Sequence, residues 1–325
     1  MEFRELPMEK MVNKNILVTG GTGFVGSHLC ERLVELGANV TSTYLSLENK
    51  SYFVSQKLAN KVDLALVDLV EYEKVFDLVT KKEIDFIFHL GAQAIVETAY
   101  YNPRRTFESN IMGTVNVLES ARLYPKVKGI VIASSDKAYG KLNKEHYLET
   151  DPLQGDHPYD VSKSAADLIG QTYFKTYNLP VIITRFGNIY GEGDMNMSRI
   201  IPGIMQAIIR NETLNIRSNG KYVRDYLYVK DVVEGYLLLA SKIDQVKGQV
   251  FNFGSSEKCS VLELVKKTEE LLGKKIAIEI LNNAKNEIPY QSLDDSKVRA
   301  LGWTQKHSLA DNLLAIKNWY LKNHE

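Results

Sequence analysis

The sequence predicts an α/β protein, built on a doubly wound parallel sheet with a smaller lobe toward the C-terminus. Apolar runs of strand length alternate with stretches long enough for crossover helices, and a glycine-rich turn directly follows the first run. Nearly continuous apolar runs suit parallel strands that are buried on both faces. The expected strands cover residues 15–20, 39–45, 62–69, 85–92, 129–135, 181–187 and 250–254.

The alternating pattern loosens after residue 188. We therefore expect residues 1–187 to form a first domain and 188–325 to form most of the smaller lobe. The segment 225–255 is expected to return to the first domain, because it ends in one more short apolar run. The charged opening residues 1–15 do not resemble a signal peptide, and we expect a frayed lead-in there.

Composition and charge narrow the class of ligand. The 325 residues are 44% apolar, and 40 basic residues balance 40 acidic ones. The chain thus lacks the broad positive charge of a nucleic-acid binder, and no stretch has the length of a membrane span. Cys30 and Cys259 could form one disulfide, but free thiols in a cytoplasmic protein are favoured. The balanced charge favours a small-molecule ligand. The six histidines show no metal-ligand spacing, so we expect no metal.

The turn "TGGTGFVGSHL" is the first candidate site. Its glycines fit the spacing that lets backbone N–H groups approach a pyrophosphate at the start of a helix. A simple tight turn is the alternative, but the position after the first strand favours a dinucleotide site. The candidate cofactor-binding residues here are Gly20, Gly23, Phe24, Val25 and Gly26.

The ends of the next two strands bear on the choice of cofactor. An acidic residue after the second strand is typical of NAD sites and an arginine of NADP sites, yet this chain has Thr43, Tyr44 and Ser46 there. Because no cation occupies that position, NAD is favoured, and NADP is not excluded. Asp68 and Leu69 end the third strand and are candidates to border the adenine, although a polar strand end needs no ligand.

Two further stretches carry candidate catalytic groups. The run "IASSDKAYG" delivers Ser135, Asp136 and Lys137 at a strand end, where short polar side chains could also simply satisfy a turn. Tyr159 and Lys163 lie four residues apart and would share one face of a helix. A lysine ammonium beside a phenol lowers the pKa of the phenol and makes it a usable base. A tyrosine and a lysine at this spacing, without other motifs, would simply lie on an exposed helix face. Here the dinucleotide turn and the polar strand end favour a catalytic role for them.

A family resemblance rests on seven stretches: "TGGTGFVGSHL", "HLGAQ", "SNIMGTVNVLE", "ASSDKAYG", "PYDVSKSAAD", "RFGNIYG" and "VRDYLYVKDVVEGYLLLA". Together they resemble the extended short-chain dehydrogenase/reductase family, with its Rossmann domain, in the sugar-nucleotide epimerase and dehydratase branch. The resemblance implies that Tyr159 removes a proton from the sugar 4-hydroxyl while hydride passes from C4 to the nicotinamide. It also implies that Lys163 holds the nicotinamide ribose and that Ser135 hydrogen-bonds the reacting oxygen.

Asp136 and Lys137 favour one reaction within this branch. Dehydratases have an acid–base pair at these positions, and the Asp-Lys pair resembles the CDP-glucose 4,6-dehydratase version; GDP-mannose 4,6-dehydratase belongs to the same branch. The implied activity is an NAD-dependent nucleoside-diphosphate-sugar 4,6-dehydratase. Asp136 would deliver a proton to O6, and Lys137 would be the C5 base, with a depressed pKa, or its orienting partner. A 4-epimerase is the alternative, then a non-catalytic NAD-binding module, and the nucleotide is undecided.

The resemblance also implies a site for the substrate diphosphate. It points to Asn188 and Arg224, with Arg199 and Arg217 as helpers, because a guanidinium gives paired hydrogen bonds to phosphate oxygens. The alternatives are a surface salt bridge between Arg224 and Asp225 and solvated faces for the other arginines.

Two more expectations follow from the resemblance. Asn110 is expected to touch the helix on the nicotinamide side, and Gln93 is expected to lie in the cofactor cleft. Helices near 105–123 and 158–177 carry apolar residues, and relatives commonly pair through them into a four-helix bundle. A homodimer is therefore expected, although an apolar stripe can equally be core.

Overall fold

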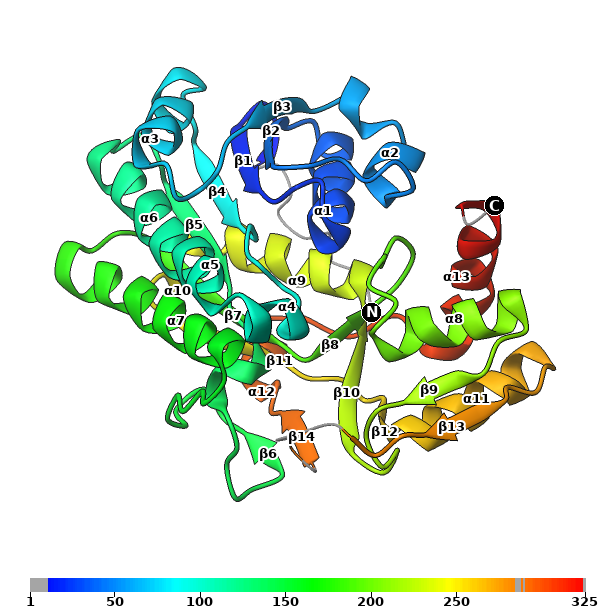
Figure 1. Ribbon diagram of the computed structural model, residues 1–325. Helices are drawn as coiled ribbons and strands as arrows, with labels where there is room; N and C mark the ends of the chain where they lie inside the picture. The colour runs from blue at the N-terminus through cyan, green and yellow to red at the C-terminus, as the bar shows by residue number, and fades with distance from the viewer. Residues whose placement is uncertain (1–10, 284–287, 289, 324–325) are drawn as a thin grey trace.

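A computed structural model of the chain describes residues 11–283, 288 and 290–323. Its main feature is a parallel seven-stranded sheet in the order β11-β7-β5-β4-β1-β2-β3 (Figure 1). All seven predicted apolar runs form its strands, which confirms the doubly wound α/β class. They are β1 (Asn15–Thr19), β2 (Asn39–Tyr44), β3 (Asp63–Leu66), β4 (Phe86–His89), β5 (Gly129–Ala133), β7 (Val181–Phe186) and β11 (Val250–Phe253).

Helices cover both faces of this sheet. On one face, α1 (Phe24–Glu35) packs against α9 (Val229–Ser241), and both share a buried apolar cluster with the sheet. The other face is covered by α3 (Tyr72–Lys81), α6 (Gly113–Leu123) and α7 (Pro158–Tyr177) (Figure 1). Successive strand residues point to opposite faces, so Ile16 joins the first cluster and Leu17 the second.

The smaller lobe has a sheet of its own, in the order β12-β10-β14-β6 with β8 added to β10. Three helices, α8 (Ile200–Arg210), α11 (Val261–Leu272) and α13 (Leu309–Asn323), enclose a separate apolar core. The strands of this sheet are β6 (His146–Tyr147), β8 (Asn188–Tyr190), β10 (Val223–Tyr228), β12 (Lys258–Ser260) and β14 (Tyr290–Leu293), and a separate pair joins β9 (Leu214–Ile216) to β13 (Ile278–Ile280).

The segment expected to return to the first domain divides between the two sheets. Helix α9 and strand β11 lie with the seven-stranded sheet, whereas β10 lies in the smaller sheet, paired with β8, β12 and β14. Strand β6 also joins the smaller sheet, although it precedes residue 188. An apolar run shows that a strand exists but does not show which sheet it joins, because the pairing partners are distant in sequence.

Short elements connect these layers. The helix expected near 105–123 is interrupted, because a π-helical turn, η3 (Glu108–Met112), separates α5 (Pro103–Phe107) from α6. The others are α2 (Tyr52–Ser55), η2 (Leu58–Asn60), α4 (Val96–Tyr101), η4 (Asp136–Tyr139), α10 (Ile243–Val246) and α12 (Ser296–Arg299).

Three sequence predictions concern the rest of the chain. Residues 1–10 of the expected lead-in lie outside the described residues, and Met11 is buried. Cys30 and Cys259 are free thiols, as expected. In the part of the chain that the structure describes, no helix combines the length and apolarity needed to cross a membrane.

Candidate active site

The candidate cofactor turn lies between β1 and α1. Gly23 caps α1 without a side-chain hydrogen bond, and no acidic residue occupies the first turn that Phe24 and Val25 begin. The first N–H groups at the positive end of the helix therefore have no side-chain cap and can bind an anion. Gly20 has φ +68°, and a Cβ at Gly26 would lie 2.3 Å from the Gly20 carbonyl oxygen, so both positions require glycine. The turn fits the pyrophosphate of a dinucleotide.

Thr43 supports this turn from the end of β2. Its hydroxyl accepts a hydrogen bond from the Gly20 N–H at 3.0 Å, and its side chain is buried. Tyr44 ends the strand, and Ser46 is exposed beyond it. The position where NAD sites usually have an acidic residue therefore stabilises the glycine turn here.

The adenine-side candidates lie after β3. Asp68 accepts a hydrogen bond from the Arg105 guanidinium at 2.7 Å, a partner that the sequence did not indicate. Leu69 is 9% exposed and packs so closely on Gly91 that a Cβ there would meet it at 2.7 Å. An adenine beside Asp68 would share that carboxylate with Arg105.

Asn110, in the π-helical turn, joins the end of β4 to α7. Its amide oxygen accepts from the Gln93 N–H at 2.7 Å, and its amide nitrogen donates to the Gln93 carbonyl and to Ser162 Oγ at 3.0 and 2.9 Å. Ser162 in turn donates to the backbone carbonyl of Tyr159 at 2.6 Å. Asn110 thus contacts the helix that carries Tyr159, and Gln93 is held beside it. Short π-helical turns such as η3 often occur at functional sites.

His89 supports the same region, and the sequence reasoning missed it. Its ring lies 2.8 Å from Thr19 Oγ1 and 2.9 Å from Thr114 Oγ1. Because the Thr114 hydroxyl donates to the Asn110 carbonyl, it must accept from His89 Nε2, and Nδ1 must accept from Thr19. Burial lowers the pKa of His89 to about 3, which keeps the ring neutral. The sequence feature that could have indicated this supporting role is a histidine inside an apolar strand.

The strand-end residues after β5 form a connected cluster. Ser135 caps η4 by accepting the Lys137 N–H at 3.2 Å, so the turn role that the residues allowed is present. The same hydroxyl donates to Asp136 Oδ1 at 2.9 Å, and Asp136 is only 4% exposed. Lys137 Nζ lies 3.5 Å from Asp136 Oδ2 and donates to Gln291 Oε1 at 2.5 Å. Gln291, from β14, is a member of this cluster that sequence reasoning missed.

Tyr159 and Lys163 both lie on α7, one turn apart. Tyr159 is hydrogen-bonded to Ser135, which joins it to the strand-end cluster. Burial raises the pKa of Tyr159 to about 12, opposed by the Arg199 charge and by the Ser135 hydrogen bond. Lys163 donates to the Ala133 carbonyl at 2.8 Å, and burial lowers its pKa to about 8. The expected lowering of the phenol pKa by Lys163 is not seen here: burial has the largest effect and raises the pKa, and the positive charge that opposes it is that of Arg199.

The diphosphate candidates lie in the smaller lobe. Asn188 donates to the Asp225 carbonyl at 3.3 Å, and Arg224, only 9% exposed, donates to the Val223 carbonyl at 2.8 Å. Asp225 is 2% exposed, so a solvent-exposed salt bridge between Arg224 and Asp225 is the wrong interpretation.

The two helper arginines differ in position. Arg199 Nη1 lies 3.1 Å from both Asp194 carboxyl oxygens, and the charge of this arginine acts on Tyr159. Arg217 is exposed, donates to the Ser198 carbonyl at 3.2 Å and lies 3.8 Å from Glu97. Arg199 is therefore paired with Asp194 and acts on Tyr159 through its charge, whereas Arg217 lies at the surface.

Comparison with known proteins identifies the family. The family model described as "GDP-mannose 4,6 dehydratase" matches residues 17–314. The chain belongs to this family. The resemblance to the sugar-nucleotide branch of the extended short-chain dehydrogenases/reductases is thereby confirmed.

Two curated relatives show how the match extends along the chain. The CDP-glucose 4,6-dehydratase of Salmonella typhimurium is 30% identical over 94% of this chain and 90% of its own length. The trifunctional UDP-glucose 4,6-dehydratase/UDP-4-keto-6-deoxy-D-glucose 3,5-epimerase/UDP-4-keto-L-rhamnose-reductase RHM3 of Arabidopsis thaliana is 29% identical over 96% of this chain. This chain spans only 48% of the length of the plant protein.

Two solved structures have the same fold. The dTDP-glucose 4,6-dehydratase DesIV from Streptomyces venezuelae, with NAD and TYD bound, has a TM-score of 0.87 and 26% identity, covering 95% of this chain and 98% of that one. The UDP-glucose 4-epimerase of Thermotoga maritima, with UDP-glucose, has a TM-score of 0.86 and 29% identity, covering 96% and 100%.

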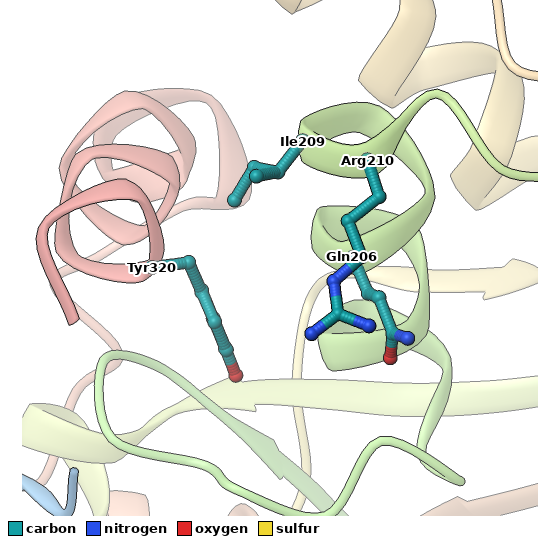
Figure 2. Close-up of a pocket in the computed structure, with 4 residues that line it drawn as sticks. All are labelled: Gln206, Ile209, Arg210 and Tyr320. Carbon is teal, nitrogen blue, oxygen red and sulfur yellow. The ribbon is translucent and has the colours of Figure 1, made fainter. Parts of the chain in front are cut away.

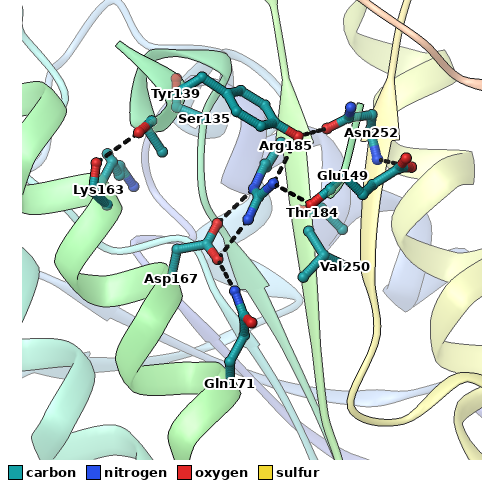
Figure 3. A network of polar contacts seen from close by, with 12 residues as sticks. Ser135, Tyr139, Glu149, Lys163, Asp167, Gln171, Thr184, Arg185, Val250 and Asn252 are labelled. Carbon is teal, nitrogen blue, oxygen red and sulfur yellow. Dashed lines mark hydrogen bonds and ion pairs between the residues drawn. The ribbon is translucent and has the colours of Figure 1, made fainter. Parts of the chain in front are cut away.

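In this member of the dehydratase family, a buried polar network anchors η4 (Figure 3). Arg185 donates to both oxygens of Asp167, at 2.7 and 2.9 Å, and to the Tyr139 hydroxyl at 2.6 Å. Tyr139 donates onward to Asn252 Oδ1 at 2.8 Å. The network fixes the C-terminal end of the turn that begins with Asp136. Its signal in the sequence was an arginine within an apolar strand.

A small cavity between α8 and α13 lies apart from this site. It measures about 10 Å³. Its lining residues are Gln206, Ile209, Arg210 and Tyr320 (Figure 2). That volume holds at most about one water molecule. Among the described residues, no group of three or more His, Cys, Asp or Glu side chains is placed to hold a metal ion.

Proposed function

We propose that the protein is an NAD-dependent nucleoside-diphosphate-sugar 4,6-dehydratase, a lyase that forms a 4-keto-6-deoxy sugar nucleotide. One observation carries the proposal: Ser135, which is hydrogen-bonded to Tyr159, also donates to the Asp136 carboxyl at 2.9 Å. Oxidation and reduction at C4 need only the hydroxyl and the phenol. A carboxyl one hydrogen bond away adds the proton donor that elimination of the 6-hydroxyl requires.

The residues divide the chemistry among them. NAD, when bound, supplies the hydride acceptor at C4 and the hydride donor at C6; the glycine turn would hold its pyrophosphate and Lys163 its ribose. Tyr159, as the phenolate, takes the 4-hydroxyl proton and becomes the phenol, and Ser135 hydrogen-bonds the reacting oxygen. Asp136 delivers a proton to O6 as water leaves. The C5 proton lost in the elimination passes to Lys137 as the base, or to a base that Lys137 orients; Lys137 Nζ lies 3.5 Å from Asp136 Oδ2 and 2.5 Å from Gln291 Oε1.

The proposal extends to cofactor and substrate. NAD is favoured over NADP because β2 ends in Tyr44 without a cation, and the DesIV structure holds NAD. Asn188 and Arg224 would bind the diphosphate, with Arg199 and Arg217 as helpers. The names of two relatives give different substrates, CDP-glucose and UDP-glucose. The nucleotide that this protein uses must therefore be identified by experiment.

An NAD-dependent 4-epimerase is the second candidate. The UDP-glucose 4-epimerase of Thermotoga maritima, at 29% identity, has the same fold as this chain. An epimerase would leave Asp136 and Lys137 without a chemical step.

The deciding experiment incubates the purified protein with CDP-, GDP-, UDP- and dTDP-hexoses and reads the products by mass. We expect loss of one water with no net NADH released, for one nucleotide above the others. A product of unchanged mass would establish the epimerase and reject the dehydratase.

A variant then tests the role of Asp136. Asp136→Asn should abolish water loss while NADH still forms on the enzyme at the C4 step. Tyr159→Phe is the comparison, since it should abolish NADH formation as well. Dehydration by Asp136→Asn at the wild-type rate would reject this assignment.

We also propose a cytoplasmic homodimer. Both cysteines are free, which suits a reducing compartment. Exposed apolar residues on η3 and α7, Met112, Val161 and Leu168, support pairing through the helices of this face. Light scattering should give twice the chain mass, and Leu168→Asp should give monomers; a monomeric wild type would exclude the dimer.

A further inference from the structure

Gln291 makes two hydrogen bonds to the Asp136–Lys137 pair from a different sheet. Its Oε1 accepts from Lys137 Nζ at 2.5 Å, and its Nε2 donates to the Asp136 backbone carbonyl at 3.0 Å. Gln291 is 2% exposed and lies on β14, paired in register with Arg224 of β10. The amide therefore connects the strand end of the main sheet to the sheet of the smaller lobe.

The chemistry of its partners fixes the orientation of this amide. An ammonium can only donate and a backbone carbonyl can only accept, so Oε1 must face Lys137 and Nε2 must face Asp136. A flipped amide would lose both bonds in a buried site, which is costly. Gln291 therefore offers the ammonium one fixed acceptor, and the second acceptor within reach is Asp136 Oδ2 at 3.5 Å.

We propose that Gln291 is a positioning residue, which holds Lys137 Nζ beside the Asp136 carboxyl during water elimination. The proposal rests on the proposed dehydratase function. Lys137 is a long side chain with four rotatable bonds, and its side chain is 25% exposed, so a single ion pair would leave it several conformations. The Gln291 acceptor selects the conformation in which the positive charge stays beside Asp136.

Two variants separate this role from a purely structural one. Gln291→Met keeps the volume and removes both hydrogen bonds, whereas Gln291→Glu keeps an acceptor for Lys137 and removes the donor to the Asp136 carbonyl. We expect Gln291→Met to lower the rate of water loss about 30-fold while NADH formation at C4 stays within about threefold. Gln291→Glu should restore water loss to within about fivefold of wild type. If the amide only braced the backbone, both variants would lose elimination equally.

A double-mutant cycle and a matched control complete the kinetic test. Because Gln291 acts through Lys137, adding Gln291→Met to Lys137→Met should lower elimination no further. Gln305→Met, which removes a glutamine bonded to Ser255 and Ser256 in the same lobe, should leave both steps unchanged. Additive losses in the cycle, or equal loss of the C4 step, would overturn the proposal.

The reactivity of Lys137 gives a readout that needs no substrate. Acetylation of Lys137 by an N-hydroxysuccinimide ester, followed by peptide mass spectrometry, should be several-fold faster in Gln291→Met and not in Gln291→Glu. Unchanged labelling in Gln291→Met would overturn the proposal. If Gln291→Met removed water at the wild-type rate, the proposed role of Gln291 would be rejected, but the proposed dehydratase function would stand. A wild type that removes no water from any sugar nucleotide would instead reject the proposed function, and the role of Gln291 with it.

Discussion

Asn110 donates a hydrogen bond to Ser162 Oγ over 2.9 Å and so ties the π-helical turn to the helix that carries Tyr159. The same amide also pairs with both backbone groups of Gln93. One side chain thus sets the spacing between the end of β4 and α7, on which the candidate cofactor and catalytic residues lie.

Replacing Asn110 by Leu should destabilise the fold by about 2 to 4 kcal/mol, because buried donors and acceptors lose their partner. Urea unfolding measures this change. Asn116→Leu is the control, since Asn116 makes one side-chain bond, to the Leu69 carbonyl, and should cost about 1 kcal/mol. Equal costs for the two variants would contradict the bracing role of Asn110.

Arg185→Leu should destabilise the protein by about 3 to 5 kcal/mol, because it leaves the Asp167 carboxylate buried without its cation. The double replacement Arg185→Leu with Asp167→Leu should cost less than the single one. Chemical denaturation provides the measurement. Arg104→Leu, which breaks a solvent-exposed pair with Glu108, should change nothing measurable. A double variant less stable than the single one would refute the prediction.

Stability should fall in acid partly because of His89. Its pKa is about 3 in the folded protein against an ordinary value of 6.5, so between these values the unfolded chain binds more protons. Stability therefore rises with pH across this window and is lost as the pH falls through it. His89→Gln should flatten that slope in denaturation series at several pH values. Burial also lowers the pKa of His28 to about 4, so His28 makes stability rise with pH in the same way. Part of the slope should therefore remain in His89→Gln.

A matched replacement serves as the control for His89. The exposed His146 can be changed to Gln without disturbing a buried contact, and the pH dependence should keep the wild-type slope. Identical slopes for His89→Gln and wild type would show that the buried imidazole is not the cause.

Gly23→Ala should weaken NAD binding about tenfold, or about 1.4 kcal/mol, because a methyl group would crowd the pyrophosphate at the start of α1. The added Cβ meets only the Gly20 carbonyl, at 3.3 Å, so thermal unfolding should shift by no more than about 3 °C. Calorimetry and thermal melts measure the two quantities. Gly26→Ala, whose Cβ would lie 2.3 Å from that carbonyl, should lose stability instead. Unaltered NAD affinity in Gly23→Ala would reject this turn as the binding site.

The sequence predicted the elements that depend on local pattern. Seven apolar runs became the seven parallel strands, because burial on both faces requires continuous apolar residues. The spacing of Tyr159 and Lys163 placed them one turn apart on α7, because helical periodicity is local. The Asp136–Lys137 pair was likewise readable, since adjacent residues stay adjacent.

By itself, then, the sequence determined the sheet, the glycine turn and the identity of the candidate catalytic groups. Only the tertiary structure decided which distant groups act on them: Gln291 bonds to Lys137 from 154 positions along the chain, and the charge of Arg199 acts on Tyr159. It also decided that burial raises the pKa of Tyr159 where the local pattern suggested lowering. Desolvation and long-range hydrogen bonds depend on how the two sheets pack, and no local spacing of residues encodes that packing.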